Sequence, residues 1–123
     1  MMTQSLEDYL ESIYIIIKSN KVARVKEISE KMNVKKPSVN NALKELEKRE
    51  LVRHEKYGYI ELTDKGMAKA EKIIAKHNML KTFLIEILNV SPENAENDAC
   101  NMEHFISEET LDKISQFMDN INK

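Results

Sequence analysis

Residues 25–48 have the sequence VKEISEKMNVKKPSVNNALKELEK, and this stretch indicates which fold the chain adopts. Apolar residues recur at helical spacing from Val25 to Met32 and predict a short helix, which Asn33 can end in a left-handed conformation. A three-residue turn follows, and Pro37 suits the first position of the next helix. Two helices joined by so short a turn are typical of a helix-turn-helix motif.

The flanking sequence predicts the other elements of a winged helix-turn-helix. An amphipathic helix is expected over roughly residues 5–18, with Ser5 as its N-cap. Two strands are expected at residues 51–55 and 59–62, with Lys56-Tyr57-Gly58 as the hairpin turn between them. This order of elements is that of a winged helix-turn-helix, whose third helix would enter the major groove of DNA.

Downstream of the hairpin, the sequence predicts only helices. Helix starts are expected at Thr63, Ser91 and Ser107, and the first of these helices has an apolar face from Met67 to Ile87. The helix that begins at Ser91 is expected to reach about residue 106. The final helix is expected to direct five apolar residues inward: Leu111, Ile114, Phe117, Met118 and Ile121. The fold class is therefore mainly α.

The composition and charge restrict the classes of function. Only four of the 123 residues are Gly or Pro, and a single cysteine, Cys100, excludes an internal disulfide and fits a reducing cytoplasm. No long apolar run or secretion signal is present, so no membrane partner is expected. Residues 1–17 carry a charge of −3, residues 18–76 carry +7 and residues 77–123 carry −6. A basic middle predicts a polyanionic partner, although solvated helix faces would give the same pattern.

The candidates for DNA contact lie on the third helix and the hairpin. Lysines there can neutralise phosphates, and asparagines can form two hydrogen bonds with adenine. Solubility alone would explain any one of these residues, and a protein-interaction module is the corresponding alternative. The candidates are Lys35, Lys36, Pro37, Ser38, Asn40, Asn41, Lys44, Lys48, Arg53, Lys56 and Tyr57.

A second group of residues predicts a metal site. Cys100, Glu103 and His104 share one face if they lie on a single helix, so a thiolate, a carboxylate and an imidazole would point at one place. Further donors occur at His77, within an apolar stripe, and at two acids of the first helix. Taken singly, these residues also suit a buried cysteine, a core histidine and a solvated face. Together, this O/N/S set suits Fe(II), Mn(II), Co(II), Ni(II) or Zn(II) rather than Ca(II) or Mg(II).

The chain resembles the diphtheria toxin repressor family of iron- and manganese-dependent transcriptional repressors. The resemblance covers essentially the whole chain and rests on SLEDYLESIY (5–14), KPSV (36–39), LTDKG (62–66), His77 and DACNMEH (98–104). It implies a winged helix-turn-helix at residues 1–63 and an all-helical dimerisation and metal-binding domain at residues 64–123. It also implies a homodimer on palindromic operators, of the short manganese-regulator type that has no SH3-like C-terminal domain.

The resemblance also implies a hybrid metal site. Asp8 and Glu11 match the manganese branch, whereas Cys100 matches a cysteine of the iron branch, so Fe(II) or Mn(II) is the expected effector. Lys81 stands where the iron branch has a glutamate of its ancillary metal site, and Glu96 stands where it has a histidine. An iron-type ancillary site is therefore not expected, although Glu96 could contribute to a rearranged one. The implied ligands are Asp8, Glu11, His77, Cys100, Glu103 and His104, with Glu96 as an optional addition.

The resulting hypothesis is a metal-dependent repressor of metal-uptake genes, with no enzymatic activity and no small organic substrate. The main alternative is a winged-helix regulator that senses oxidants through Cys100. A metallohydrolase using the same ligands is disfavoured, because the sequence has neither a Gly-rich loop nor a Ser-His-Asp pattern.

Overall fold

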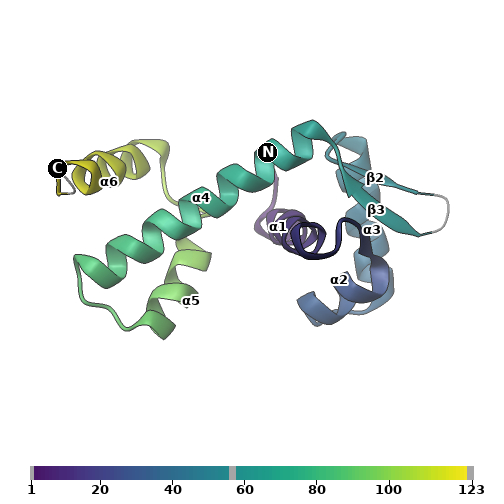
Figure 1. Ribbon diagram of the computed structural model, residues 1–123, viewed down its shortest axis with the longest axis horizontal. Helices are drawn as coiled ribbons and strands as arrows, with labels where there is room; N and C mark the ends of the chain where they lie inside the picture. Colours follow the sequence, from purple (N-terminus) through teal and green to yellow (C-terminus); the bar gives the residue numbers. More distant parts are fainter. Residues whose placement is uncertain (1, 56–57, 122–123) are drawn as a thin grey trace. The chain divides into compact units, whose positions relative to one another are not determined.

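The computed structural model describes residues 2–55 and 58–121. The chain divides into two compact units, an N-terminal unit (Met1–Glu71) and a C-terminal unit (Lys72–Lys123). The division falls within the long helix α4. Within the described residues, the elements are α1 (Gln4–Asn20), β1 (Ala23–Arg24), α2 (Val25–Met32), α3 (Lys36–Lys48), β2 (Val52–His54), β3 (Tyr59–Leu62), α4 (Asp64–Glu86), α5 (Pro92–Met102) and α6 (Glu108–Ile121) (Figure 1).

The N-terminal unit is a winged helix-turn-helix, as predicted. Its helices α1, α2 and α3 accompany a small antiparallel sheet of strand order β1-β3-β2. The hairpin register pairs Val52 with Leu62 and His54 with Ile60. Strand β1, which pairs Ala23 with Ile60, was not predicted, because two residues are too few to show an alternating pattern.

Local capping accounts for the starts of α1 and α4 and for the end of α2. The N-cap of α1 is Thr3 and not the predicted Ser5: Thr3 Oγ1 accepts a hydrogen bond from the Leu6 amide at 3.2 Å, and Ser5 lies inside the helix. Asn33 ends α2 in the predicted left-handed conformation, with φ 55° and ψ 50°. Thr63 caps α4 as predicted, since its Oγ1 accepts from the Gly66 amide at 3.0 Å.

The start of α4 packs against Leu51, which lies between α3 and β2, and Gly66 is required for this close approach. A Cβ atom added at Gly66 would overlap the carbonyl oxygen of Leu51. The same junction is tied by two hydrogen bonds of Thr63: its amide donates to Leu51 O at 3.1 Å, and its hydroxyl donates to Glu50 O at 2.7 Å. Thr63 and Gly66 therefore fix the start of α4 against the segment that joins α3 to β2.

The C-terminal unit differs from the prediction at the end of α5. Ser91 caps this helix as expected, but the helix ends at Met102 rather than near residue 106. Beyond it the chain forms turns, in which the amides of Phe105 and Ile106 both donate to the carbonyl oxygen of Met102, at 3.0 and 2.9 Å. Two amides converging on one carbonyl do not continue the regular helical pattern.

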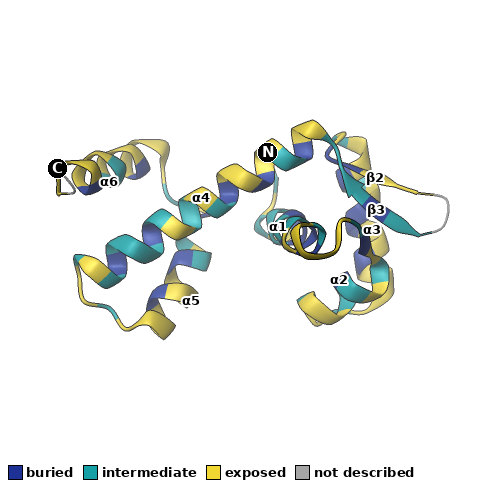
Figure 2. Cartoon of the chain, in the orientation of Figure 1, coloured by how far each residue is buried: buried dark blue, intermediate teal, exposed yellow. Residues whose placement is uncertain are grey.

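The core of the C-terminal unit is small. It consists of Leu80, Leu84, Ala95, Ala99 and Leu111, with partly buried residues around it. On α6, Leu111 and Met118 are buried as predicted. The predicted inward orientation is wrong for Phe117 and Ile121, whose exposed fractions are 46% and 50%. Figure 2 shows that α6 exposes much of its surface.

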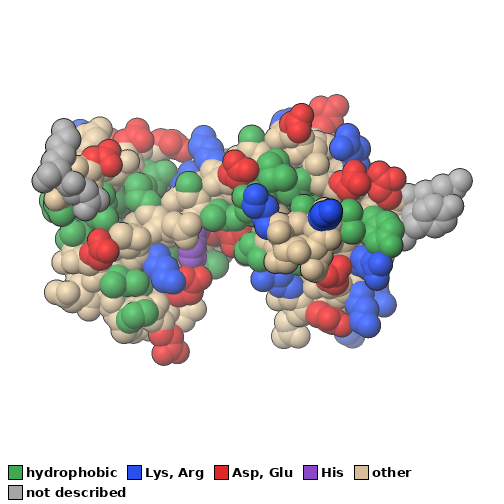
Figure 3. Space-filling view, in the orientation of Figure 1, with side chains coloured by type: hydrophobic (Ala, Val, Ile, Leu, Met, Phe, Trp, Pro, Cys, Tyr) green, Lys and Arg blue, Asp and Glu red, His purple; other side chains and the backbone are tan. Residues whose placement is uncertain are grey.

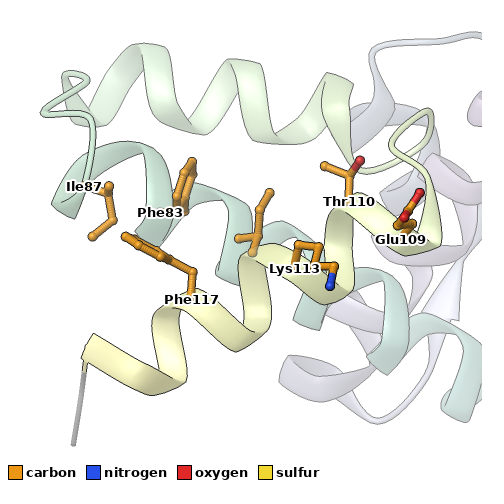
Figure 4. A pocket seen from close by; sticks show the side chains of 7 residues that line it. Phe83, Ile87, Glu109, Thr110, Lys113 and Phe117 are labelled. Carbon is orange, nitrogen blue, oxygen red and sulfur yellow. The ribbon is translucent and has the colours of Figure 1, made fainter.

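The exposed side chain of Phe117 lines an open apolar cavity of about 400 Å³. It lies between α4 and α6, where the Phe83 and Phe117 rings meet edge to face with centroids 6.3 Å apart (Figure 4). Ile87 and Ile114 complete its apolar wall, and Glu109, Thr110 and Lys113 provide the polar part of its lining. Helix α6 therefore leaves part of its apolar stripe in solvent.

Candidate metal centre

The imidazole of His77 lies between two carboxylates in the C-terminal unit. Its Nδ1 atom is 3.0 Å from Glu103 Oε2, and its Nε2 atom is 3.0 Å from Glu96 Oε1. His77 is on α4, whereas Glu96 is on α5 and Glu103 is the C-cap of α5. The packing of these two helices therefore brings His77 against two glutamates that are 19 and 26 positions away from it in sequence.

Glu103 is the most deeply buried acid of this group. Its side chain has an exposed fraction of 0%, and that of His104 is 1%. Glu103 Oε2 faces His77, while Glu103 Oε1 is 3.4 Å from His104 Nε2. Removing a carboxylate from water costs free energy unless cations or hydrogen-bond donors compensate it. The two imidazoles flanking Glu103 form the kind of N and O donor set that a divalent transition metal binds.

Cys100 can provide a sulfur donor in the C-terminal unit, in addition to the nitrogen and oxygen donors of His77, Glu103 and His104. It lies one turn before Glu103 and is half-buried. Although α5 ends at Met102, Glu103 keeps helical backbone angles of φ −59° and ψ −25°, so Cys100 and Glu103 retain their predicted relation. His104 belongs to the following turn instead. The prediction that all three residues lie on one helix is therefore wrong for His104.

Glu96 has a different environment from Glu103. Its side chain is 52% exposed, and its Oε2 atom accepts from Lys81 Nζ at 2.9 Å. The hydrogen bond from the Lys81 ammonium, followed by that of His77, lowers the pKa of the Glu96 carboxyl below its ordinary value. Glu96 is therefore a carboxylate at neutral pH. In the sequence, Lys81 is recognisable only as a departure from the family resemblance. No local pattern of residues predicts that Lys81 pairs with Glu96, which lies on another helix.

The other two predicted ligands, Asp8 and Glu11, lie on α1 in the N-terminal unit. They are one helical turn apart, and both are half-buried. Their spacing places them on the same side of α1, as the sequence predicted.

Most of the predicted DNA-contacting residues lie on α3 or at its N-cap. Lys35 is its N-cap, and every predicted residue from Lys35 to Lys48 is exposed. Lys and Arg side chains are visible over the region of α2 and α3 in Figure 3. Arg53 on β2 is exposed, but its Nη2 atom is 3.8 Å from Glu61 Oε2. Lys56 and Tyr57 lie outside the described residues.

No helix in the described part of the chain is long and apolar enough to cross a membrane.

Both halves of the chain match models of one protein family. The model described as the N-terminal DNA binding domain of iron dependent repressors matches residues 1–60. The model described as the metal binding and dimerisation domain of iron dependent repressors matches residues 63–123. The two matches together cover nearly the whole chain.

Individual relatives agree with these matches. An uncharacterised HTH-type transcriptional regulator of Methanocaldococcus jannaschii is 40% identical over 119 residues, which covers 96% of this chain and 95% of the relative. The HTH-type transcriptional regulator MntR of Geobacillus kaustophilus is 36% identical over 118 residues, covering 96% and 83%. The solved structure of the manganese regulator SloR aligns with a TM-score of 0.82 at 31% identity, covering 96% of this chain but only 55% of SloR. The chain described here belongs to the iron-dependent repressor family.

Proposed function

We propose that the protein is a metal-activated transcriptional repressor that binds palindromic double-stranded DNA as a homodimer in the cytoplasm. Fe(II) or Mn(II) is the proposed effector, and genes for uptake of that metal are the proposed targets. Residues 1–63 would bind DNA, and residues 64–123 would bind metal and form the dimer.

The buried Glu103 carboxylate carries the metal part of the proposal. It lies between the imidazoles of His77 and His104, at 3.0 and 3.4 Å, and none of the three side chains is more than 12% exposed. Buried charges in proteins are paired or coordinate metals. Cys100 supplies sulfur from the neighbouring turn, and the family resemblance adds two oxygen donors on α1. The proposed ligands are Asp8, Glu11, His77, Cys100, Glu103 and His104.

The polar outer side of α3 supports the DNA part of the proposal. Asn40 and Asn41 are exposed one to two turns into the helix, where a recognition helix contacts base edges. Lysines at both ends of α3 are placed to bind phosphates. The manganese regulation named for SloR adds support for a metal-dependent role. The proposed DNA contacts are Lys35, Lys36, Pro37, Ser38, Asn40, Asn41, Lys44, Lys48, Arg53, Lys56 and Tyr57.

Activation would follow from linkage between the two binding events. If the metal-loaded homodimer binds DNA more tightly than the metal-free one, the DNA-bound homodimer binds metal more tightly by the same factor. The protein would then repress transcription only when metal is plentiful.

The decisive experiment measures DNA affinity with Fe(II), with Mn(II) and with excess chelator. A palindromic site first selected from random DNA serves as the probe, and Fe(II) is handled without oxygen. We expect at least ~5-fold tighter binding with one of the metals, the low end of typical allosteric coupling. His104→Ala should remove this gain while sedimentation still shows a dimer. Equal affinity with metal and with chelator would contradict the proposal.

A further inference from the structure

The two carboxylates that contact His77 are not equivalent. Glu103, on the Nδ1 side, has an exposed fraction of 0%, whereas Glu96, on the Nε2 side, is 52% exposed. Glu96 is also bound to a cation already, since its second oxygen accepts from Lys81 Nζ at 2.9 Å. One nitrogen of the imidazole therefore faces the buried donor cluster, and the other faces a solvated ion pair.

The helices explain why this ion pair reaches His77. Lys81 follows His77 by four residues on α4, so the two side chains lie one above the other on the same face. Glu96 on α5 meets both, with one oxygen for each. A half-exposed ion pair of this kind contributes little to stability, but it holds the Glu96 carboxylate beside α4, where the second oxygen contacts His77.

Histidines that bind metals usually donate their second ring N–H to a carboxylate, which fixes the tautomer and the ring orientation. Glu96 has the features of such an acceptor. Its Oε1 atom lies at hydrogen-bonding distance from His77 Nε2, at 3.0 Å, and its Oε2 atom accepts from Lys81 Nζ at 2.9 Å. Glu103, flanked by His77 and His104, has instead the burial and the neighbours of a ligand.

We infer that Glu96 is a positioning residue and not a metal ligand. It accepts a hydrogen bond from His77 Nε2–H, is held in place by Lys81, and leaves His77 Nδ1 as the nitrogen that binds metal beside Glu103. This inference rests on the proposed metal-binding function. It assigns to Lys81 and Glu96 a shared role, which is to present His77 in one tautomer.

The first test needs no metal. Nitrogen-15 NMR of the imidazoles in the full-length, metal-free protein should show that His77 prefers to carry a proton on Nε2, the nitrogen that faces Glu96. Glu96→Ala should remove this preference, and Glu93→Ala, which deletes the same charge one turn earlier on α5, should preserve it. Lys81→Gln should weaken the preference, because it removes the cation that holds Glu96. Lys81→Arg, which keeps the charge, and the control Lys72→Gln should both leave the preference as in the wild type. A metal-free wild type without a proton on His77 Nε2 would overturn the inference.

The second test uses Zn(II) as a diamagnetic probe. The Nδ1 resonance of His77 should shift on coordination while the Nε2–H proton persists. Calorimetry should show that Glu96→Ala lowers Zn(II) affinity by about 10- to 100-fold, the usual effect of removing an outer-shell partner, and that Glu93→Ala does not. Coordination through Nε2, or equal affinities for Glu96→Ala and Glu93→Ala, would refute the positioning role. If the wild type binds neither Zn(II) nor Mn(II), the proposed function fails instead, and the metal-free spectra still decide the tautomer.

Discussion

The two units of this protein bury their side chains in different ways. Among residues 2–55 and 58–121, nine large apolar side chains have an exposure below 2%, and eight of them belong to the N-terminal unit while Leu80 belongs to the C-terminal unit. The reverse holds at the surface. Among the described residues, Leu88, Phe105, Phe117 and Ile121 are exposed in the C-terminal unit, against Ile15 alone in the N-terminal unit.

The kind of buried group differs as well. The C-terminal unit buries the Glu103 carboxylate beside two imidazoles, whereas in the described part of the N-terminal unit the buried polar residue is the neutral Ser12. The N-terminal unit thus buries nearly all of its large apolar side chains, and the polar side of α3 is exposed to solvent. The C-terminal unit leaves apolar surface and a buried charge, and these are the features that dimerisation and a metal ion would complete.

The largest expected effect concerns salt and the N-terminal unit. If the homodimer makes roughly 6–10 phosphate contacts, DNA affinity should fall by about 10³- to 10⁵-fold between ~50 and ~200 mM salt. Metal affinity of the C-terminal unit should change far less, because the side chains of three of its proposed donors, His77, Glu103 and His104, are at most 12% exposed. Fluorescence anisotropy at several salt concentrations gives the slope for wild type, Lys44→Ala and the control Lys72→Ala. Each lost phosphate contact should lower the slope by ~0.9, and a flat dependence in the wild type would point to a protein partner.

The second prediction compares the two cores. Leu43 is 1% exposed, so Leu43→Ala should lower the free energy of unfolding by about 2–5 kcal/mol at every protein concentration. Leu111 is 9% exposed in a smaller core, and Leu111→Ala should cost less. Urea titrations followed by circular dichroism measure both values. Equal losses would mean that the C-terminal core is as well packed as the N-terminal one.

The third prediction concerns the exposed apolar surface of α6. Placing a charge there with Phe117→Asp should weaken dimerisation at least ~10-fold, since buried aromatic residues dominate the binding energy of interfaces. Ile15→Asp, a matched change in the N-terminal unit, should leave the dimer intact. Sedimentation over a range of micromolar concentrations separates the two variants. A wild type that is monomeric with metal present would exclude the homodimer itself.

The smallest expected effect concerns which metal activates the protein. The thiolate of Cys100 favours softer ions, so Cys100→Glu should shift the ratio of the Fe(II) to the Mn(II) response toward Mn(II). A change of roughly 5-fold in that ratio is the scale expected for an allosteric difference. Cys100→Ser distinguishes the loss of sulfur from the gain of a carboxylate. An unchanged ratio in both variants would show that Cys100 does not select the metal.

Local features of the sequence were sufficient where the backbone follows local rules. Asn33 in a left-handed conformation and Thr63 as a cap occur as predicted, and Pro37 lies in the first turn of α3, one position later than predicted because the helix begins at Lys36. Local rules gave no indication of the positive φ values of Lys21 and Glu50, because neither residue type favours that conformation. Both residues lie just beyond the end of a helix, where the following chain determines the turn.

The arrangement of the candidate metal centre also could not be predicted fully from local sequence features. The sequence indicated which residues could bind a metal, but it placed His104 on a helix that ends two residues before it. It also provided no means of distinguishing Glu96 from Glu103. Both are glutamates of the same segment, and only the folded chain makes them differ in burial, in the side of His77 that each one contacts and in the pairing of Glu96 with Lys81.

The amino-acid sequence alone therefore determined the class of fold, the order of elements in the winged helix-turn-helix and the exposed row of α3, because helix periodicity, caps and turns depend on neighbouring residues. The packing of α4 against α5 determined the rest of the candidate site. It buried Glu103, paired Lys81 with Glu96 and gave each nitrogen of His77 its own carboxylate. Such pairings depend on distances between side chains of separate helices, which no local pattern of residues specifies.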